Sequence, residues 1–399
     1  MVLIDTVVIV SLIASSPAVL RWSSMRRRRT ALVLAVGAAL VAQVACTTGP
    51  DPARVGIAPP PARGPAESGP VLFVSPAGSD QSPGTREAPL RTLAGAASLA
   101  RPGTTVQVAP GEYRESLTTR ASGRADARIA YTSVIPWEAR IVADEDADFA
   151  WRNDGDFVDI VGFDITGDSS DGLLDTGSNV RITGNRVHGF ENGSCIFTYS
   201  AGYALRNVDI VSNVVSDCGS SSLEHGIYPA HAQGTISNNM SFGNSGYGIH
   251  CWHACNALTI SNNLVFDNGD GGILVGQGDA PNYGDVPADN LVVSNNIAYA
   301  NRGVGIVEYG ATGSNNRFLN NSVADNEGEG MSLQAGGESG TSTASPEFVD
   351  FQPDGSGDYR LEPSSPLVDS GTSTGAPATD IAGAARPLGA GYDVGPYER

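Results

Sequence analysis

The sequence contains no lysine, so all 24 of its basic residues are arginine, and they stand against 43 acidic residues. The formal net charge is −19 at neutral pH with histidine uncharged. A field of this sign repels the phosphates of nucleic acid and the headgroups of anionic membranes. We therefore expect no nucleic-acid partner. An acidic polysaccharide would be repelled as well, unless local arginines or a bridging cation, with Ca²⁺ the candidate cofactor, compensate.

The N-terminal apolar stretch, residues 31–42, is too short to span a bilayer. It follows Arg26–Arg29, an arrangement typical of a secretory signal. We expect residues 1–45 to be a signal peptide, with the true start at Met25, and residues 46–69 to be a flexible linker. Cleavage before Cys46 would create a lipid anchor, whereas ordinary cleavage near Ala45 would not. Both alternatives predict an extracellular or cell-surface protein, whose membrane contact is made only through Cys46.

Helical periodicity is absent from the body of the chain, and a repeat based on asparagine is present instead. Six asparagines recur at intervals of 28, 26, 24, 33 and 25 residues, each shortly after a β-branched or aromatic residue: Asn185, Asn213, Asn239, Asn263, Asn296 and Asn321. In the later units a second asparagine follows after five residues, and a pair such as Gly248-Ile249 then opens the next unit. Short β-prone runs with a period in the twenties predict a solenoid.

A single coil of such a solenoid cannot bury its apolar side chains, so coils must stack, with equivalent residues about 4.8 Å apart. Inward Ile, Val and Leu then form continuous ladders. Asparagines at tight bends tolerate left-handed backbone angles and can bond to the amides of the coils above and below. The Leu-x-Leu spacing of leucine-rich repeats is missing. We predict an all-β monomer, a right-handed parallel β-helix over residues 70–345.

Both ends of this region carry recognisable segments. They are residues 71–80 (VLFVSPAGSD), 89–93 (PLRTL), 97–106 (ASLARPGTTV) and 109–113 (APGEY), and, near the C-terminus, 359–361 (YRL), 365–371 (SPLVDSG), 380–383 (DIAG) and 393–398 (DVGPYE). The chain thereby resembles the pectate-lyase-like right-handed parallel β-helix superfamily, extracellular bacterial β-helix repeat proteins. The resemblance implies a short capping helix near residues 92–100 and a β-helix-associated tail over residues 346–399.

The resemblance does not imply one reaction, because this superfamily holds lyases, hydrolases, epimerases and non-catalytic proteins. The calcium-dependent pectate lyases with this kind of opening use a lysine base. This chain has no lysine, so no catalytic position is transferred by analogy.

Four cysteines remain beyond the leader: Cys195, Cys218, Cys251 and Cys255. An even number in an oxidising compartment predicts disulfides, and three connectivities are possible. We favour Cys251 with Cys255, which closes a small loop, and Cys195 with Cys218.

Four of the five histidines lie within 29 residues: His225, His231, His250 and His253. Alignment of the coils on Ile227 and Ile249 places Tyr228 beside His250, His231 beside His253, and His225 beside Tyr247. Because strand side chains alternate and the isoleucines point inward, Tyr228 and His250 should face solvent. We predict a catalytic group of His250, Tyr228, His231 and His253, in which imidazole and phenol exchange protons with a substrate. The remaining histidine, His188, we interpret as a packing residue at a turn.

Residues around this group are candidates for substrate binding. Trp252 and Tyr309 could stack on sugar rings, Glu308 offers a carboxylate, and Arg206 or Arg302 could neutralise a uronate. Extra residues near 276–289, 199–206 and 218–222 would wall a groove over the histidines. The predicted substrate-binding set is His225, Trp252, Tyr309, Glu308, Arg206, Arg302, Asp279 and Tyr283.

Four functions remain open. We favour a polysaccharide lyase that cleaves a uronate-containing glycan by β-elimination. A glycoside hydrolase would need two carboxylates about 5–9.5 Å apart, with Glu224, Asp279, Asp285 and Glu308 as candidates. A zinc site could form from His231, His250 and His253. A non-catalytic glycan-binding or structural surface protein would need no chemistry at all. The acidic residues Asp144, Glu145, Asp146 and Asp148 could bind calcium, but a solvated loop explains them equally well.

Overall fold

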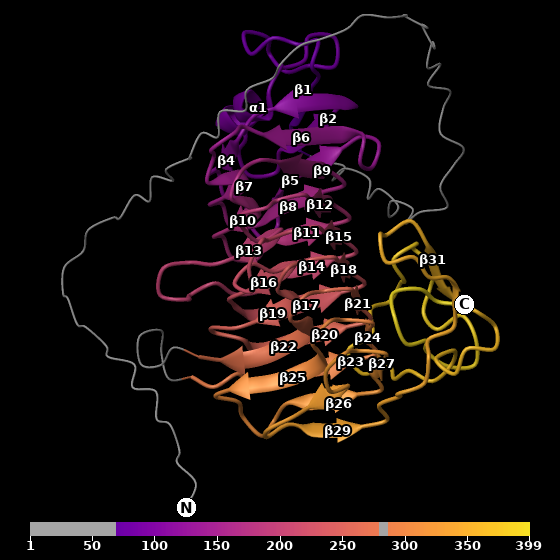
Figure 1. The fold of residues 1–399 in the computed structure, drawn as a ribbon. Helices are drawn as coiled ribbons and strands as arrows, with labels where there is room; N and C mark the ends of the chain where they lie inside the picture. The colour runs from indigo at the N-terminus through magenta and orange to yellow at the C-terminus, as the bar shows by residue number, and fades with distance from the viewer. Residues whose placement is uncertain (1–68, 279–285) are drawn as a thin grey trace, which may run out of the picture. The chain divides into compact units, whose positions relative to one another are not determined.

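A computed structural model describes residues 69–278 and 286–399, and the described residues between 71 and 339 form a three-sided parallel β-solenoid of about nine coils (Figure 1). The predicted signal peptide, nearly all of the linker and Cys46 lie outside the described residues. Each full coil contributes one strand to each of three sheets, here called A, B and C. The predicted all-β solenoid is therefore confirmed.

The strands of each sheet follow one another in chain order. Sheet A comprises β1 (Val71–Val74), β2 (Thr105–Val108), β5 (Ile129–Ser133), β8 (Val158–Val161), β11 (Arg181–Thr183), β14 (Asp209–Val211), β17 (Ala232–Ser237), β20 (Asn256–Ser261), β23 (Val292–Ser294), β26 (Arg317–Leu319) and β29 (Gly337–Ser339). Sheet B comprises β3 (Gly111–Arg114), β6 (Ala139–Ala143), β9 (Asp164–Gly167), β12 (Arg186–His188), β15 (Val214–Ser216), β18 (Met240–Phe242), β21 (Leu264–Phe266), β24 (Ile297–Tyr299) and β27 (Ser322–Ala324). Sheet C comprises β4 (Leu117–Thr119), β7 (Phe149–Asn153), β10 (Asp171–Asp175), β13 (Ile196–Thr198), β16 (Ile227–Pro229), β19 (Tyr247–Cys251), β22 (Gly271–Gln277), β25 (Val304–Gly310) and β28 (Met331–Ser332).

Inward β-branched and aromatic side chains stack from coil to coil. On sheet A, for example, Ile210 pairs with Ile236, which pairs with Ile260, and Val293 and Phe318 continue the column. All five are fully buried. Burial of an Ile or Val side chain stabilises a fold by about 1.5–3 kcal/mol, so these columns account for much of the core.

The predicted asparagine ladder lies at the corner between sheets A and B. The side-chain amide of each rung donates to the side-chain oxygen of the next at 2.9–3.1 Å, in the series Asn185, Asn213, Asn239, Asn263, Asn296 and Asn321. The later asparagines form a second ladder, between sheets B and C, in the series Asn244, Asn268, Asn301 and Asn326. Both ladders satisfy buried backbone groups at tight corners, which would otherwise be costly.

The asparagine that precedes each later rung of the first ladder has a different role. Asn238, Asn262, Asn295 and Asn320 adopt left-handed φ angles of 49–55°. Their amides donate to carbonyls of the C-terminal segment at 2.7–3.0 Å: Thr379, Gly395, Thr372 and Ser370. The repeated Asn-Asn pair thus joins two functions, since one residue holds the coils together and the other docks residues 370–395.

The C-terminal segment, which contains the antiparallel hairpin β30 (Phe348–Asp350) and β31 (Asp358–Leu361), covers the outer face of sheet B (Figure 1). Its buried apolar side chains Tyr359, Leu361, Leu367, Ile381 and Val394 pack with Val214, Met240, Phe242, Leu264, Phe266 and Ile297 of the solenoid. Sheet C remains on the other side of the molecule.

The helix expected near residues 92–100 is present as α1 (Leu93–Leu99). Its N-cap Thr92 accepts from the Gly95 N–H at 2.9 Å, and the Glu115 carboxylate accepts from the N–H groups of Leu93 and Ala94. These bonds satisfy the free donors of the first turn. That the helix closes the end of the solenoid stays a prediction.

Candidate functional site

Tyr228 and His250 are neighbours on adjacent coils of sheet C, as the alignment of the repeats predicts. Ile227 of β16 pairs with Ile249 of β19, and both isoleucines are fully buried. The next residue on each strand therefore points outward. The Tyr228 ring lies edge-on to the His250 imidazole, with centroids 5.0 Å apart.

His225 joins this pair from the turn before β16. Its ring centroid lies 3.8 Å from that of His250. The backbone N–H of Tyr247 donates to Nδ1 of His225 at 3.1 Å. Because Nδ1 accepts this bond, the neutral imidazole must carry its proton on Nε2.

Both imidazoles are held neutral by their surroundings. Burial lowers the pKa of His225 to about 3. Burial, with smaller repulsion from His225 and His253, lowers the pKa of His250 to about 2. Nδ1 of His250 is buried and receives no hydrogen bond from any described residue. His250 is therefore neutral, and a neutral imidazole has one ring nitrogen that can accept a proton or a hydrogen bond.

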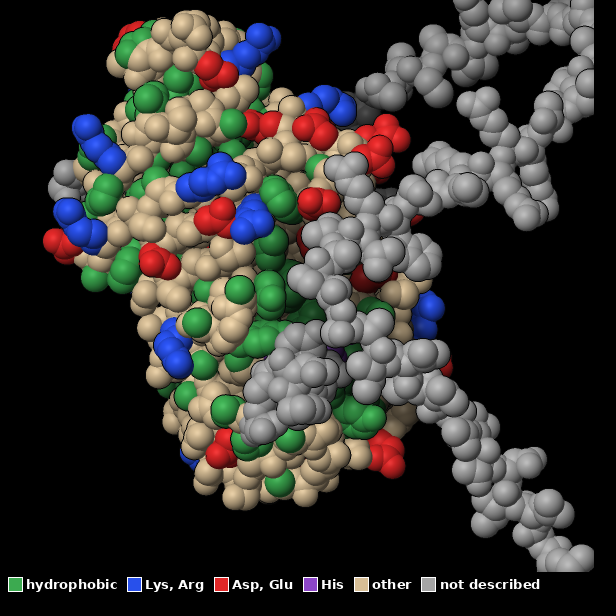
Figure 2. Space-filling model, turned by 90° about the vertical axis from the view of Figure 1, so that its left-hand side faces the viewer, with side chains coloured by type: hydrophobic (Ala, Val, Ile, Leu, Met, Phe, Trp, Pro, Cys, Tyr) green, Lys and Arg blue, Asp and Glu red, His purple; other side chains and the backbone are tan. Residues whose placement is uncertain are grey.

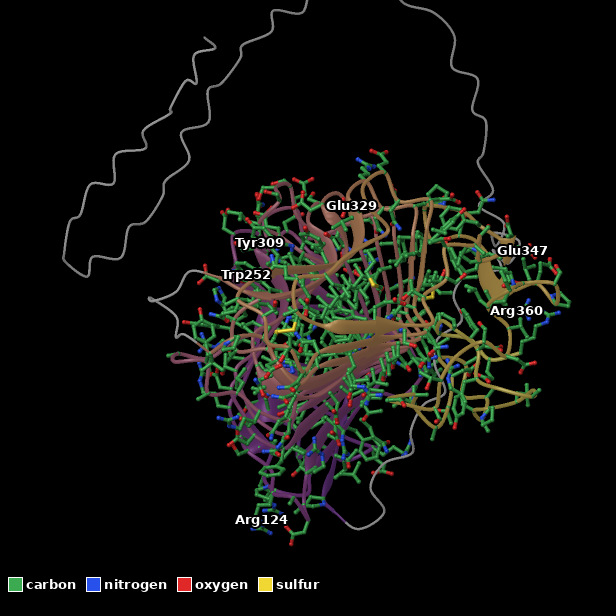
Figure 3. All side chains as sticks on the ribbon, turned by 90° about the horizontal axis from the view of Figure 1, so that it is seen from below. Arg124, Trp252, Tyr309, Glu329, Glu347 and Arg360 are labelled. Carbon is green, nitrogen blue, oxygen red and sulfur yellow. A yellow bond between two sulfur atoms is a disulfide. The ribbon has the colours of Figure 1, made fainter. Side chains whose placement is uncertain are left out.

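A longer series of rings extends from this pair across sheet C. We call it the ring band, and its members are Tyr199, Phe197, Tyr228, His250, Trp252 and Tyr309. Successive centroids lie 5.7, 4.9, 5.0, 5.6 and 5.9 Å apart. Trp252 and Tyr309 lie next to each other on the side of the molecule away from Glu347 and Arg360 of the C-terminal segment (Figure 3).

The ring band is positioned by strand geometry and by glycine. The Trp252 ring lies against Gly276 and Gly278, and a Cβ at Gly278 would stand 1.8 Å from the ring. Only glycine permits this approach. Tyr309 at the end of the band is 60% exposed. Apolar side chains gather along the middle of the face that carries sheet C, whereas charged side chains are more frequent toward its N-terminal end (Figure 2).

The predicted pairing of His231 with His253 is wrong. Ile249 follows Ile227 by 22 residues, but Asn256 follows its partner Ala232 by 24, so two additional residues lie in the turn between. In this longer turn His253 and Ala254 have left-handed φ angles of 57° and 54°. The register consequently places His231 inside the solenoid.

The two histidines therefore occupy different environments. His231 is fully buried, its Nδ1 lies 2.7 Å from the Thr198 hydroxyl, and burial lowers its pKa to about 4. The His253 ring lies 5.0 Å from that of Tyr203 and 6.5 Å from that of Tyr228. His253 thus borders the ring band, and His231 does not reach it.

Glu308 is not placed for substrate binding. It is 2% exposed, and its carboxylate accepts from the Asn316 amide and from the backbone N–H groups of Gln334, Ala335 and Gly336 at 2.8–2.9 Å. These four bonds close the turn after β28. Glu308 has this inward position because it is two residues beyond the inward Ile306.

The predicted arginines lie elsewhere. Arg206 is exposed, and its backbone forms an isolated parallel β-bridge with Ala232 at the start of β17. Arg302 pairs with Asp267 at 3.4 Å, at the corner before β25. Glu224, one of the proposed hydrolytic acids, accepts from the N–H groups of Ser220 and Ser221. Asp279, Tyr283 and Asp285 lie outside the described residues.

Both predicted disulfides are present. Cys195 is bonded to Cys218, and Cys251 to Cys255. The second of them closes the loop that carries Trp252 and His253, and so restrains one end of the ring band.

The three imidazoles of the zinc hypothesis do not converge, since His231 lies inside the solenoid. Residues 69–278 and 286–399 contain no group of three or more His, Cys, Asp or Glu side chains that could hold a metal ion, and this range includes Asp144, Glu145, Asp146 and Asp148. Within the same residues no helix has the length and apolar character to cross a membrane.

Comparison with known families identifies the scaffold. A family model described as the Pel9A-like right-handed β-helix region matches residues 72–338. The chain belongs to this family. The match covers more than half of the sequence and confirms the predicted handedness and superfamily.

Solved structures support the assignment of the fold. Pectate lyase Pel9A superposes with a TM-score of 0.61 at 17% identity, over 84% of this chain and 97% of that one. A rhamnogalacturonan lyase gives 0.54 at 16% identity, over 72% and 92%. The uncharacterized protein YwoF of Bacillus subtilis (strain 168) is 54% identical over 56 residues, which is 14% of this chain and 12% of that protein. This chain thus matches only a small part of YwoF.

This Pel9A-like chain departs from the calcium-dependent pectate lyases that it resembles, since it has no lysine. Sequence reasoning identified Tyr228, His250, Trp252 and Tyr309 but missed Phe197 and Tyr199. A signal was available, because Phe197 occupies the same column as Tyr228.

Proposed function

We propose that this protein is an exported, carbohydrate-active β-helix protein that binds a uronate-containing glycan along the ring band and cleaves it by β-elimination. The ring band is the observation that carries the proposal. Its six rings cross several coils of one sheet, and such flat apolar surfaces suit the faces of successive sugar rings. Support comes also from Pel9A and the rhamnogalacturonan lyase, which share the fold and are named as polysaccharide lyases.

In the proposed reaction, the C5 proton beside the uronate carboxyl passes to the neutral imidazole of His250. The electron pair of the C5–H bond forms the C4=C5 double bond, and the C4–O bond breaks. The Tyr228 phenol gives its proton to the departing oxygen. A carboxylate bound beside His250 would raise its low pKa, because a nearby negative charge favours imidazolium. The base would thus gain strength only when an acidic sugar is in place.

A second candidate is non-catalytic glycan binding. The low pKa values of His225 and His250 favour it, because a strongly depressed imidazole is a weak base in the unoccupied site. Neutral imidazoles and aromatic rings alone suffice for recognition of sugars. Glycoside hydrolysis has less support, since the described residues bring no two of the proposed carboxylates together on the ring band.

Export is part of the proposal. Disulfides persist in oxidising compartments and are rare in the cytosol, and this chain forms two. A substrate polysaccharide would be met outside the cell. Lipid attachment at Cys46 remains one of the two predicted routes to the surface.

The test is to incubate the purified protein with polygalacturonate, alginate, rhamnogalacturonan and a neutral galactan. We expect ultraviolet absorbance from an unsaturated product with one of the uronate glycans and none with the galactan. New reducing ends without that absorbance would show a hydrolase. Retention of a glycan on the immobilised protein without any product would show the binder, and neither outcome is compatible with β-elimination.

A further inference from the structure

A cleft lies on a different face from the ring band, between the outer side of sheet B and the C-terminal segment. It encloses about 370 Å³. One wall comes from sheet B and the turn before β6, and the other is the tail turn 354–356. Its lining residues are Trp137, Arg140, Arg186, His188, Val214, Ser216, Phe242, Asp354, Gly355 and Ser356.

The sheet B wall gathers positive charge around one buried acid. Asp164 is 2% exposed and accepts from Nε and Nη2 of Arg186 at 2.8 and 2.7 Å. The imidazole of His188 lies 3.0 Å from the same carboxylate, and the Arg140 guanidinium 3.6 Å. Burial alone would raise the pKa of Asp164, but the bonds from His188 and Arg186 hold it near 2. The carboxylate is therefore ionised and already satisfied.

The arginines retain capacity for another anion. Arg140 is too far from Asp164 for a direct hydrogen bond, and its side chain is 47% exposed. Arg186 donates Nε and Nη2 to Asp164 and Nη1 is not used there. The two guanidinium groups outnumber the one ionised carboxylate, Asp164, on this wall, which is a local reversal of sign in a chain with a net charge of −19.

The rest of the cleft suits a sugar better than a simple anion. Trp137 is fixed by a bond from its ring N–H to the Gly184 carbonyl at 2.8 Å, with the Arg186 guanidinium 5.4 Å from its ring. The opposite wall carries the Asp354 carboxylate, which disfavours a doubly charged phosphate or sulfate. That wall is held firmly, since a Cβ at Gly355 would stand 2.3 Å from the Phe242 ring.

We propose that this cleft binds one acidic sugar residue, with the carboxylate on Arg140 and Arg186 and the ring beside Trp137. It would be a second glycan site, on another sheet from the ring band. The inference rests on the proposed function only for the class of glycan, and it requires no turnover. A chain held here would remain attached while the ring band engages another part of the same polysaccharide.

The test uses D-galacturonate, a single sugar that has no glycosidic bond to cleave, followed by NMR of the arginine side-chain Nε–H signals. We expect saturable shifts at Arg140 and Arg186 in the wild type, with a Kd in the millimolar range. Arg140→Gln should weaken binding at least tenfold, while Arg360→Gln, an exposed arginine in the C-terminal segment, should leave it unchanged. Galactose, which lacks the carboxylate, should bind at least tenfold more weakly than galacturonate.

Several results would overturn the inference. They are the absence of saturable shifts, equal affinity for galactose, unchanged binding in Arg140→Gln with an unaltered melting temperature, or sulfate binding as tightly as galacturonate. His250→Ala keeps the two sites apart, since it should abolish turnover of glycans and leave galacturonate binding intact. Loss of galacturonate binding in His250→Ala would assign the sugar to the ring band and refute a site on sheet B.

Discussion

Substitution of Asn263 by alanine should be among the most destabilising single changes in the solenoid. Its side-chain oxygen accepts from the backbone N–H and the amide of Asn239 at 2.9 and 3.0 Å. Its amide donates to the Ile236 carbonyl at 2.8 Å and to the Asn296 side-chain oxygen at 2.9 Å. All these partners are fully or almost fully buried.

Alanine removes four bonds but does not leave every partner unsatisfied. The amide of Asn239 keeps a bond to the Ile210 carbonyl, and the oxygen of Asn296 keeps the bond from the backbone N–H of residue 263. The backbone N–H of Asn239 loses its partner, and a buried unsatisfied group costs about 1–3 kcal/mol. The carbonyl of Ile236 lies in a strand that is paired on both sides, so it loses one bond, worth about 0.5–1.5 kcal/mol, without being left unsatisfied. We therefore expect Asn263→Ala to lower the free energy of unfolding by about 1.5–4.5 kcal/mol.

The neighbouring asparagine provides a matched control. Asn262 has a φ of 54° and donates to the carbonyls of Asp393 and Gly395 in the C-terminal segment. Asn262→Gly keeps the left-handed conformation accessible, and the Gly395 carbonyl keeps a bond from Arg386. The buried Asp393 carbonyl loses its bond from Asn262, so we expect a cost of about 1–3 kcal/mol. Urea unfolding of both variants, followed by circular dichroism, gives the comparison. A loss below about 1 kcal/mol for Asn263→Ala would refute the role given to the ladder residue, and unchanged stability in Asn262→Gly would refute the docking role of its neighbour.

Three further predictions concern the site and its supports. Replacement of both Cys195 and Cys218 by serine should lower the free energy of unfolding by about 2–4 kcal/mol in chemical denaturation, because the unfolded chain gains freedom; an unchanged midpoint would contradict this. Since burial lowers the pKa of His225 to about 3, its contribution to stability is complete above pH ~6.5 and is lost as pH falls toward 3. Between pH 7.5 and 4.5 the wild type should lose about 3 kcal/mol more than His225→Asn, and parallel pH profiles of the two in urea titrations would refute a neutral buried imidazole. Trp252→Ala should weaken glycan binding about tenfold in calorimetry, the loss expected for one stacked ring, with a smaller loss for Tyr309→Ala; unchanged affinity in both would remove the end of the ring band from the site.

The fold could be predicted from the sequence because one coil resembles the next. The recurrence of Ile236, Ile260 and Val293, each three residues before an asparagine, specifies both the inward column and the ladder. The same register placed Tyr228 beside His250, because alternation along a strand needs no tertiary information. The role of Asn262 and its equivalents could not be read in this way, since their partners come from residues 370–395.

The errors in the predicted site have identifiable causes. His231 was aligned with His253 across a turn that contains two additional residues, and a shift in register changes which face a side chain occupies. Glu308 was assigned to the groove although its distance from Ile306 already indicates an inward position. The cleft on sheet B was beyond prediction, because Trp137 and His188 lie two coils apart and Asp354 comes from the C-terminal segment, whose place on the solenoid no repeat specifies. From the sequence we interpreted His188 as a packing residue. In the structure its imidazole forms a hydrogen bond with the Asp164 carboxylate.

In the proposed reaction, His250 accepts the proton during β-elimination on the ring band. The most direct measurement is the initial rate of unsaturated-product formation by wild type and His250→Gln, on whichever uronate glycan the wild type cleaves. Melting temperatures taken in parallel confirm that both proteins are folded. We expect the rate to fall at least a hundredfold in His250→Gln, in line with the usual contribution of a general base of about 10²–10⁴-fold. A folded His250→Gln protein that forms product at the wild-type rate would contradict it.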